Sequence, residues 1–216
     1  MALTLTHLRF GQEIMRHLRV SDVAAYYSGI IYPDSRILTG LPRIRTHGED
    51  CPGNPFAPGL SDFERGWAAH ILYDHLAHPH YFGLSPQSLS PEELVGDLRR
   101  STWIYITAIK TVEDLQSFGL VAAEKFFQSL PIPASPRGES ADLLRRYFDL
   151  QRKMYARRPG PAEYRALRSN FQIKPELMDG IAAVTARIQA DNALLSKVAA
   201  IYQSILAVSR EGHGGA

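Results

Sequence analysis

Four of the chain's eight histidines lie close together, between residues 70 and 80, in the stretch RGWAAHILYDHLAHPHYFGL that spans residues 65 to 84. On a helix, side chains four positions apart lie on the same face, so His70 and Asp74 would project side by side. An imidazole nitrogen and a carboxylate oxygen in that arrangement can bind one divalent cation together. A purely structural His–Asp contact is the alternative interpretation of this pair.

Three residues upstream could complete a metal site. Asp34 follows Pro33 and has no evident capping role, and His47 follows Thr46 in a segment rich in glycine and proline. Taken singly, an aspartate in a turn and a solvated histidine explain these two residues equally well. Together with His7 they extend a set of nitrogen and oxygen donors without sulfur, which suits zinc, manganese or iron better than calcium.

Two other histidines of the stretch stand near its end. On an ideal helix His78 is rotated by roughly 80° from His70. Because Pro79 disfavours helical backbone at the residue before it, we expect the helix to end near His78. His80 would then lie beyond the helix, where the chain can turn back toward the ligands, and which of the two histidines ligates is left open.

Four short motifs occur in a fixed order: His7, Gly-x-x-x-Pro-Asp at 29–34, Thr-His at 46–47, and Gly-Trp-x-x-His-x-x-x-Asp at 66–74. In this order they resemble the zinc-dependent phospholipase C superfamily, which includes the fungal single-strand nucleases. The resemblance covers roughly residues 5–85. It implies a mostly helical protein that binds up to three metal ions and hydrolyses phosphoesters with a metal-bound water.

The resemblance also implies how the ligands are divided between ions. The first ion would be held by Asp34, His47, His70 and Asp74. Asp74 would bridge to a second ion that His7 also binds, and His80 would belong to a further site. Secreted members of the family complete that further site with a downstream histidine and acidic residue, whereas this chain has no histidine between His80 and His213. We therefore expect one or two ions, with Zn²⁺ favoured and Mn²⁺ or Fe as alternatives.

Three arginines lie between the predicted ligands of the upstream segment and could bind a substrate phosphate. They are Arg36, Arg43 and Arg45. The planar guanidinium group suits this role because it offers two parallel donors to a phosphate. Solvated surface charge that balances neighbouring acidic residues is an equal alternative. We assign catalytic roles to Asp74 and Arg45, and we expect hydrolysis of a small phosphorylated substrate by metal-activated water.

Two other functions stay open. An HD-type phosphohydrolase is also all-α with histidine and aspartate ligands, but its defining His-Asp dipeptide is replaced here by the reverse order, Asp74-His75. A non-enzymatic helical protein could use a metal only to tie an irregular segment to the helices. The apolar face of the C-terminal helix could in either case serve a homodimer.

The composition is that of an ordinary globular protein, with 45% hydrophobic and 21% charged residues. A net charge of +2 argues against a binding face for duplex nucleic acid. The single cysteine, Cys51, excludes a disulfide within the chain and a thiolate metal cluster. No apolar run approaches the ~20 residues of a membrane span, and the N-terminal residues lack the apolar core of a secretory signal. We therefore expect a cytoplasmic protein without stable membrane anchoring.

Helices must position these residues, because helical periodicity dominates the chain and no strand alternation is evident. We predict a single all-α domain over residues 1–216. Residues 1–85 would carry the metal site, 86–210 would complete the helical bundle, and 211–216 would form a flexible tail.

The boundaries of the elements follow from capping residues and helix breakers. Residues 29–60 contain five prolines and five glycines and predict a long irregular loop beside the metal site. Ser61 and Glu64 form a capping box at the start of the helix that carries His70. The other predicted helices are a first helix around His7, a short one over 21–29, one from Ser90, one over 141–158 and a long last helix over about 175–209.

Overall fold

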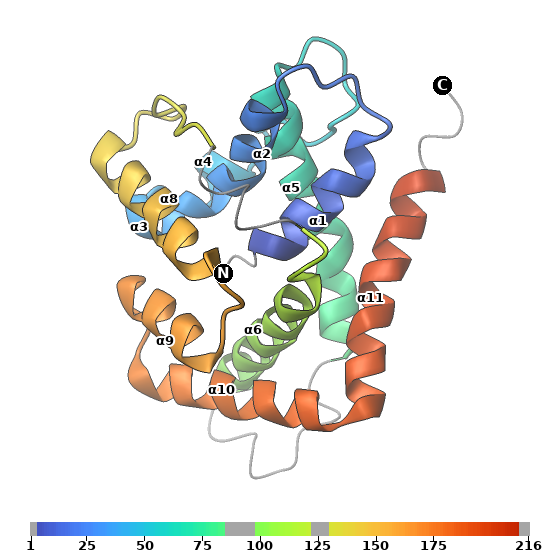
Figure 1. Ribbon diagram of the computed structural model, residues 1–216, viewed down its shortest axis with the longest axis vertical. Coiled ribbons are helices and arrows are strands. Elements are labelled where there is room, and N and C mark those ends of the chain that lie inside the picture. Colours follow the sequence, from blue (N-terminus) through green and yellow to red (C-terminus); the bar gives the residue numbers. More distant parts are fainter. Residues whose placement is uncertain (1–3, 85–97, 122–129, 212–216) are drawn as a thin grey trace.

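The computed structural model describes residues 4–84, 98–121 and 130–211 (Figure 1). It confirms the all-α prediction, because every regular element in these ranges is a helix. In chain order the elements are α1 (Thr4–Met15), α2 (Val23–Ile31), the 3₁₀ helix η1 (Tyr32–Ser35), α3 (Arg36–Thr39), α4 (Ile44–His47), α5 (Asp62–Gly83), α6 (Leu98–Ser117), α8 (Ala141–Tyr155), α9 (Pro161–Asn170), α10 (Pro175–Ala190) and α11 (Asn192–Glu211). None of these helices combines the length and apolar character needed to cross a membrane.

Helix α6 is the central element of the bundle, and it packs against α1, α5, α10 and α11 (Figure 1). Its buried residue Asp114 accepts the backbone N–H groups of Leu5 (2.8 Å) and Thr6 (3.3 Å) through Oδ1. Oδ2 of the same carboxylate accepts the hydroxyl groups of Tyr155 in α8 and Tyr164 in α9. Asp114 thus satisfies the free N–H groups at the start of α1, as an N-cap residue does, and fixes that helix on α6.

Helices α2 and α5 cross at two glycines. A Cβ atom on Gly29 would lie 1.9 Å from the carbonyl oxygen of Phe63, and one on Gly66 would lie 1.7 Å from the carbonyl oxygen of Tyr26. Both distances are far inside van der Waals contact, so only glycine allows the two backbones to come this close. The crossing places the end of α2, and the η1 helix that follows it, directly beside α5.

The prediction of one long irregular loop over residues 29–60 is wrong in its first half. Residues up to His47 belong largely to α2, η1, α3 and α4, and the irregular segment covers 48–61. Gly29 serves close packing within a helix rather than breaking one. Pro33 lies in the first turn of η1, a position at which proline is tolerated. The count of glycines and prolines therefore overestimated the irregular structure.

Helix α5 begins as predicted and ends later than predicted. The Ser61 side chain accepts from the Glu64 N–H and the Glu64 side chain accepts from the Ser61 N–H, which confirms the capping box. The helix does not end near His78 but continues through Pro79 to Gly83. Beyond the proline, Tyr81 is buried and its hydroxyl donates to the Glu113 carboxylate of α6. Packing of the last turn against α6 accounts for a helix that continues past the proline, at the cost of one backbone hydrogen bond.

The C-terminal part differs from the prediction in two respects. The expected single helix over 175–209 is two helices, α10 and α11, with Asp191 in extended conformation between them. The Asp191 carboxylate accepts the N–H groups of Ala193 and Leu194, which caps the start of α11. Helix α9 was not predicted, and the predicted cap at Ser90 lies outside the described residues.

Most apolar residues of the predicted last helix pack into the core of this chain. The buried ones are Met178, Ile181, Val184, Ile188, Val198, Ile201, Tyr202, Ile205 and Leu206. The homodimer through this region stays a prediction.

Candidate metal centre

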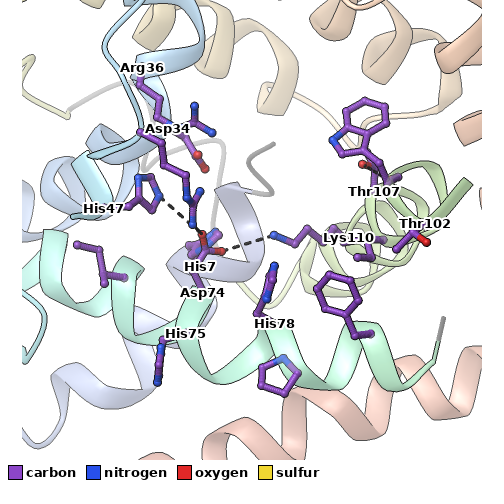
Figure 2. A pocket seen from close by; sticks show the side chains of 16 residues that line it. His7, Asp34, Arg36, His47, Asp74, His75, His78, Thr102, Thr107 and Lys110 are labelled. Atoms are coloured by element: carbon purple, nitrogen blue, oxygen red, sulfur yellow. Dashed lines mark hydrogen bonds and ion pairs between the residues drawn. The ribbon is translucent and has the colours of Figure 1, made fainter. Parts of the chain in front are cut away.

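Five of the predicted ligands come together at one place between α1, η1, α4 and α5, and Figure 2 labels His7, Asp34, His47 and Asp74 among them. His70 Nε2 lies 3.7 Å from Asp34 Oδ2, and His47 Nε2 lies 3.6 Å from Asp74 Oδ2. His7 Nε2 lies 3.4 Å from the other oxygen of Asp74, Oδ1. Two sets of three donor atoms, each within 4.8 Å of one another, are formed: His7, His70 and Asp74, and Asp34, His47 and His70.

Helix α5 supplies two of these side chains, and α1 brings a third to it. His70 and Asp74 are four residues apart on α5 and project toward the same space, as their spacing predicts. The ring of His7, from α1, stacks on that of His70 with centroids 3.9 Å apart and an angle of 6° between the planes. The anchoring of the start of α1 on α6 therefore also positions a predicted ligand.

The other two side chains come from the short helices. Asp34 lies in η1, which continues α2 directly beyond the glycine crossing. His47 is the last residue of α4. The Trp67 indole N–H of α5 donates to the carbonyl oxygen of Thr46 at 2.8 Å, which ties α4 to α5 next to His47. The Trp67 and Thr46 positions of the two motifs thus have a structural role.

The hydrogen bonds of two imidazoles fix which nitrogen points into the site. Nδ1 of His70 lies 2.8 Å from the carbonyl oxygen of Ile30, so it must carry the proton that it donates. Nδ1 of His47 lies 2.8 Å from the hydroxyl oxygen of Thr46, and that hydroxyl donates to the Arg43 carbonyl oxygen. Both histidines are thus assigned as the tautomer with a lone pair on Nε2.

These lone pairs are the best indication that the residues fit a cation. The Nε2 atoms of His47 and His70 are buried, make no hydrogen bond, and face carboxylate oxygens at 3.6–3.7 Å. A lone pair and a carboxylate repel each other unless a positive charge lies between them. Bonds of about 2.1 Å to a tetrahedral zinc ion place its ligand atoms about 3.4 Å apart, close to these separations.

The protonation states also suit a cation. Burial lowers the pKa of His70 to about 3 and that of His47 to about 4, so both rings are neutral at pH 7. Burial raises the pKa of Asp34, but the positive charges that His70 and His47 acquire in acid outweigh this effect and bring the value to about 2, so Asp34 is ionised at pH 7. Burial likewise opposes ionisation of Asp74, and Lys110 holds its pKa well below the usual range. His47 and His70 therefore offer neutral imidazoles beside two carboxylates.

A cavity of ≈ 1080 Å³ opens beside the donors. Its wall carries three cationic side chains, those of Arg36, Arg43 and Lys110 (Figure 2). Arg43 and Lys110 each lie 3.5 Å from an Asp74 oxygen. Farther along α5 and α6, the cavity is lined by apolar side chains that include Phe82 and Trp103. The cavity thus has a charged end at the donors and an apolar end away from them.

Lys110 was not found by the sequence analysis. It comes from α6, 36 residues after Asp74, and no motif includes it. The sequence gives only a weak indication of its role. Three charged residues, Lys110, Glu113 and Asp114, lie in a helical segment whose apolar residues Ile109 and Val112 are buried.

Two predicted site residues are not brought into the centre. Arg45 is exposed and its guanidinium donates to the carbonyl oxygen of Arg137, because residues two apart on a helix face opposite ways and His47 faces the site. His80 belongs to neither set of donors. Since α5 continues past Pro79, His80 lies about 240° around the helix from Asp74 and cannot turn back toward it. The centre formed by these donors therefore includes neither Arg45 nor His80, and their predicted roles stay predictions. His78 lines the cavity but belongs to neither donor set.

Comparisons with known proteins do not add a relative. No family model matches this chain, and neither the curated proteins nor the solved structures contain a match. The resemblance to the zinc-dependent phospholipase C superfamily, carried by the four motifs between His7 and Asp74, stays a prediction.

Proposed function

We propose that this protein is a metal-dependent phosphoester hydrolase that binds a divalent ion, with zinc favoured, at the centre described above. The observation that carries the proposal is the coincidence of two features in one cavity. Donor atoms of Asp34, His47 and His70 converge beside it, with Asp34 and His47 in its lining, and three cationic side chains stand in its wall. A site that only tied segments together would need no cationic cavity beside it.

The residues of the chain would divide the work as follows. A divalent ion held there would neutralise charge on a phosphoryl group and lower the pKa of a water molecule. The guanidinium groups of Arg36 and Arg43 would bind phosphoryl oxygens at the mouth of the cavity. Asp74, kept ionised by Lys110, would hold its carboxylate between the imidazoles and the substrate. The apolar end of the cavity would take the organic group of the ester.

The test is a joint measurement of metal content and turnover on protein purified without a histidine tag. Zinc, manganese and iron are measured by elemental analysis, and hydrolysis is assayed on p-nitrophenyl phosphate and bis-p-nitrophenyl phosphate. Asp74→Asn should lose bound metal and hydrolysis together, because an amide cannot supply the negative charge. Asp142→Asn, on the exposed surface of α8, should change neither.

Two outcomes would contradict the proposal. Wild-type protein with stoichiometric metal and no hydrolysis of either ester would point to a structural site. Metal content that is unchanged in Asp74→Asn would mean that the ligands on α5 are wrongly assigned.

A further inference from the structure

The two oxygens of the Asp74 carboxylate face different groups. Oδ2 lies near His47 Nε2 (3.6 Å) and the Arg43 guanidinium (3.5 Å). Oδ1 lies near His7 Nε2 (3.4 Å) and the Lys110 ammonium (3.5 Å). The two-ion arrangement implied by the family resemblance would place a second ion on the side of Oδ1 and His7. In this structure that side already carries a positive charge.

Lys110 is held there by its surroundings. Its side chain is 14% exposed, and it reaches from α6 across to α5, where it meets Asp74 (Figure 2). Its Nζ also lies 5.3 Å from the ring centroid of Tyr81, an electron-rich face that favours a cation. A divalent ion bound to the same carboxylate oxygen would be repelled by this ammonium group.

The histidine shared by the two sets of donors leads to the same conclusion. His70 belongs to both sets, but only its Nε2 offers a lone pair, because Nδ1 donates to the Ile30 carbonyl oxygen. A single lone pair binds one ion. The two sets therefore describe alternative groupings around one ion rather than two complete sites.

The charges of the cavity wall also favour a single ion. Three fixed positive charges, on Arg36, Arg43 and Lys110, face two carboxylates, on Asp34 and Asp74. With one divalent ion these charges sum to +3, and a dianionic phosphate would reduce the excess to +1. A second ion would add to an excess that is already present.

We propose that the centre holds one divalent ion, and that the Lys110 ammonium stands in for a second one by binding a phosphoryl oxygen of the substrate. This inference rests on the proposed function and adds the number of ions and a substrate-binding residue to it. The probe for the substrate is inorganic phosphate, because it presents the same oxygens without an organic group.

The experiment combines ion counting with phosphate binding. Wild-type protein saturated with zinc and freed of excess metal should contain one ion per chain by elemental analysis and native mass spectrometry. Lys110→Met keeps the length of the side chain without its charge; it should keep the ion and bind phosphate roughly 10- to 100-fold more weakly by calorimetry, the loss expected for one charge-assisted hydrogen bond. Lys110→Arg should restore most of the phosphate affinity, and Lys197→Met on the exposed face of α11 should match the wild type.

The outcomes separate this inference from the proposed function. Two tightly bound ions in the wild type, or phosphate affinity that is unchanged in Lys110→Met, would overturn the role of Lys110 and leave a metal-dependent hydrolase in place. A wild type that binds no ion would overturn both. If Lys110→Met does not fold, the ion count of the wild type still decides the question, because one ion supports the inference and two tightly bound ions overturn it.

Discussion

Asp74 lies between two imidazoles and two cationic side chains, each within 4 Å of one of its oxygens. The two cationic side chains differ in their exposure to solvent. The Lys110 side chain is largely buried, whereas that of Arg43 is 57% exposed. An exposed ion pair contributes little to stability, so the Arg43 guanidinium can leave Asp74 for a substrate at small cost.

Alanine substitutions at Arg43 and Arg45, the two arginines on either side of Ile44, test whether the Arg43 guanidinium binds the substrate phosphate. Arg43→Ala should raise KM for a phosphate ester by roughly tenfold or more, since it removes a charge-assisted hydrogen bond to phosphate. Arg45→Ala should leave KM and kcat unchanged, because its side chain points away from the cavity toward the Arg137 carbonyl. Steady-state kinetics on p-nitrophenyl phosphate measures both. Equal effects of the two substitutions would contradict the placement of Arg43 at the phosphate.

At the residue scale the sequence allowed most of the site to be predicted. The pair His70–Asp74 follows from helical spacing alone. The upstream ligands could be proposed because their motifs occur in a family-like order. Lys110 could not, because its approach to Asp74 depends on how α6 packs on α5, and no local pattern records that packing. His80 was misplaced for a similar reason: contacts of Tyr81 with α6 outweigh the local effect of Pro79.

The crossing of α2 and α5 is the element-scale feature on which the centre depends. It brings the carbonyl oxygen of Ile30 to Nδ1 of His70, and it sets η1 with Asp34 beside α5. Glycine counts alone suggested broken structure here, since a glycine that permits close packing and one that ends a helix look alike in a sequence. The short helices α3 and α4 were missed for this reason.

Alanine at the crossing should be costly. Gly66→Ala would place a methyl group 1.7 Å from the Tyr26 carbonyl oxygen, and because backbone cannot yield as a side chain can, the free energy of unfolding should fall by about 3 kcal/mol or more. Gly53→Ala is the matched control, because nothing lies within 4 Å of a Cβ atom there. Urea denaturation followed by circular dichroism measures the difference. A Gly66→Ala protein as stable as Gly53→Ala would refute the close approach.

At the scale of the whole molecule, α6 carries buried charges that serve three different neighbours. Asp114 holds the start of α1, Lys110 faces the metal centre, and Glu113 accepts hydrogen bonds from the hydroxyls of Tyr73 and Tyr81 on α5. Buried charges are costly, so each must be compensated by its partners. Burial raises the pKa of Glu113 to about 7, although the tyrosines and Lys110 oppose the shift.

This shift predicts a pH dependence of stability. Because the pKa of Glu113 is higher in the folded chain than its ordinary value of 4.5, the folded state binds the proton more tightly. The contribution of this proton to the free energy of unfolding is complete below pH 4.5 and is lost as the pH rises through 7. The free energy of unfolding then changes by at most about 1.4 kcal/mol per pH unit.

The measurement compares the free energy of unfolding of the wild type and Glu113→Gln between pH 5 and pH 8, with a chelator present so that bound metal does not contribute. The difference between the two proteins isolates Glu113 from other groups, including His47 and His70, whose lowered pKa values act in the opposite direction. The free energy of unfolding of the wild type relative to that of Glu113→Gln should fall as the pH rises. A difference that is constant over this range would show that Glu113 does not titrate there.

The reciprocal glycine contact also limits how the molecule can move. Sliding α5 along α2 by one residue, a rise of about 1.5 Å, would replace each glycine at the contact by a residue with a side chain and drive that side chain into the opposing backbone. The contact therefore fixes the register of α2 relative to α5. A rearrangement during a binding cycle is therefore not expected to include translation along α2 of the helix that carries His70 and Asp74.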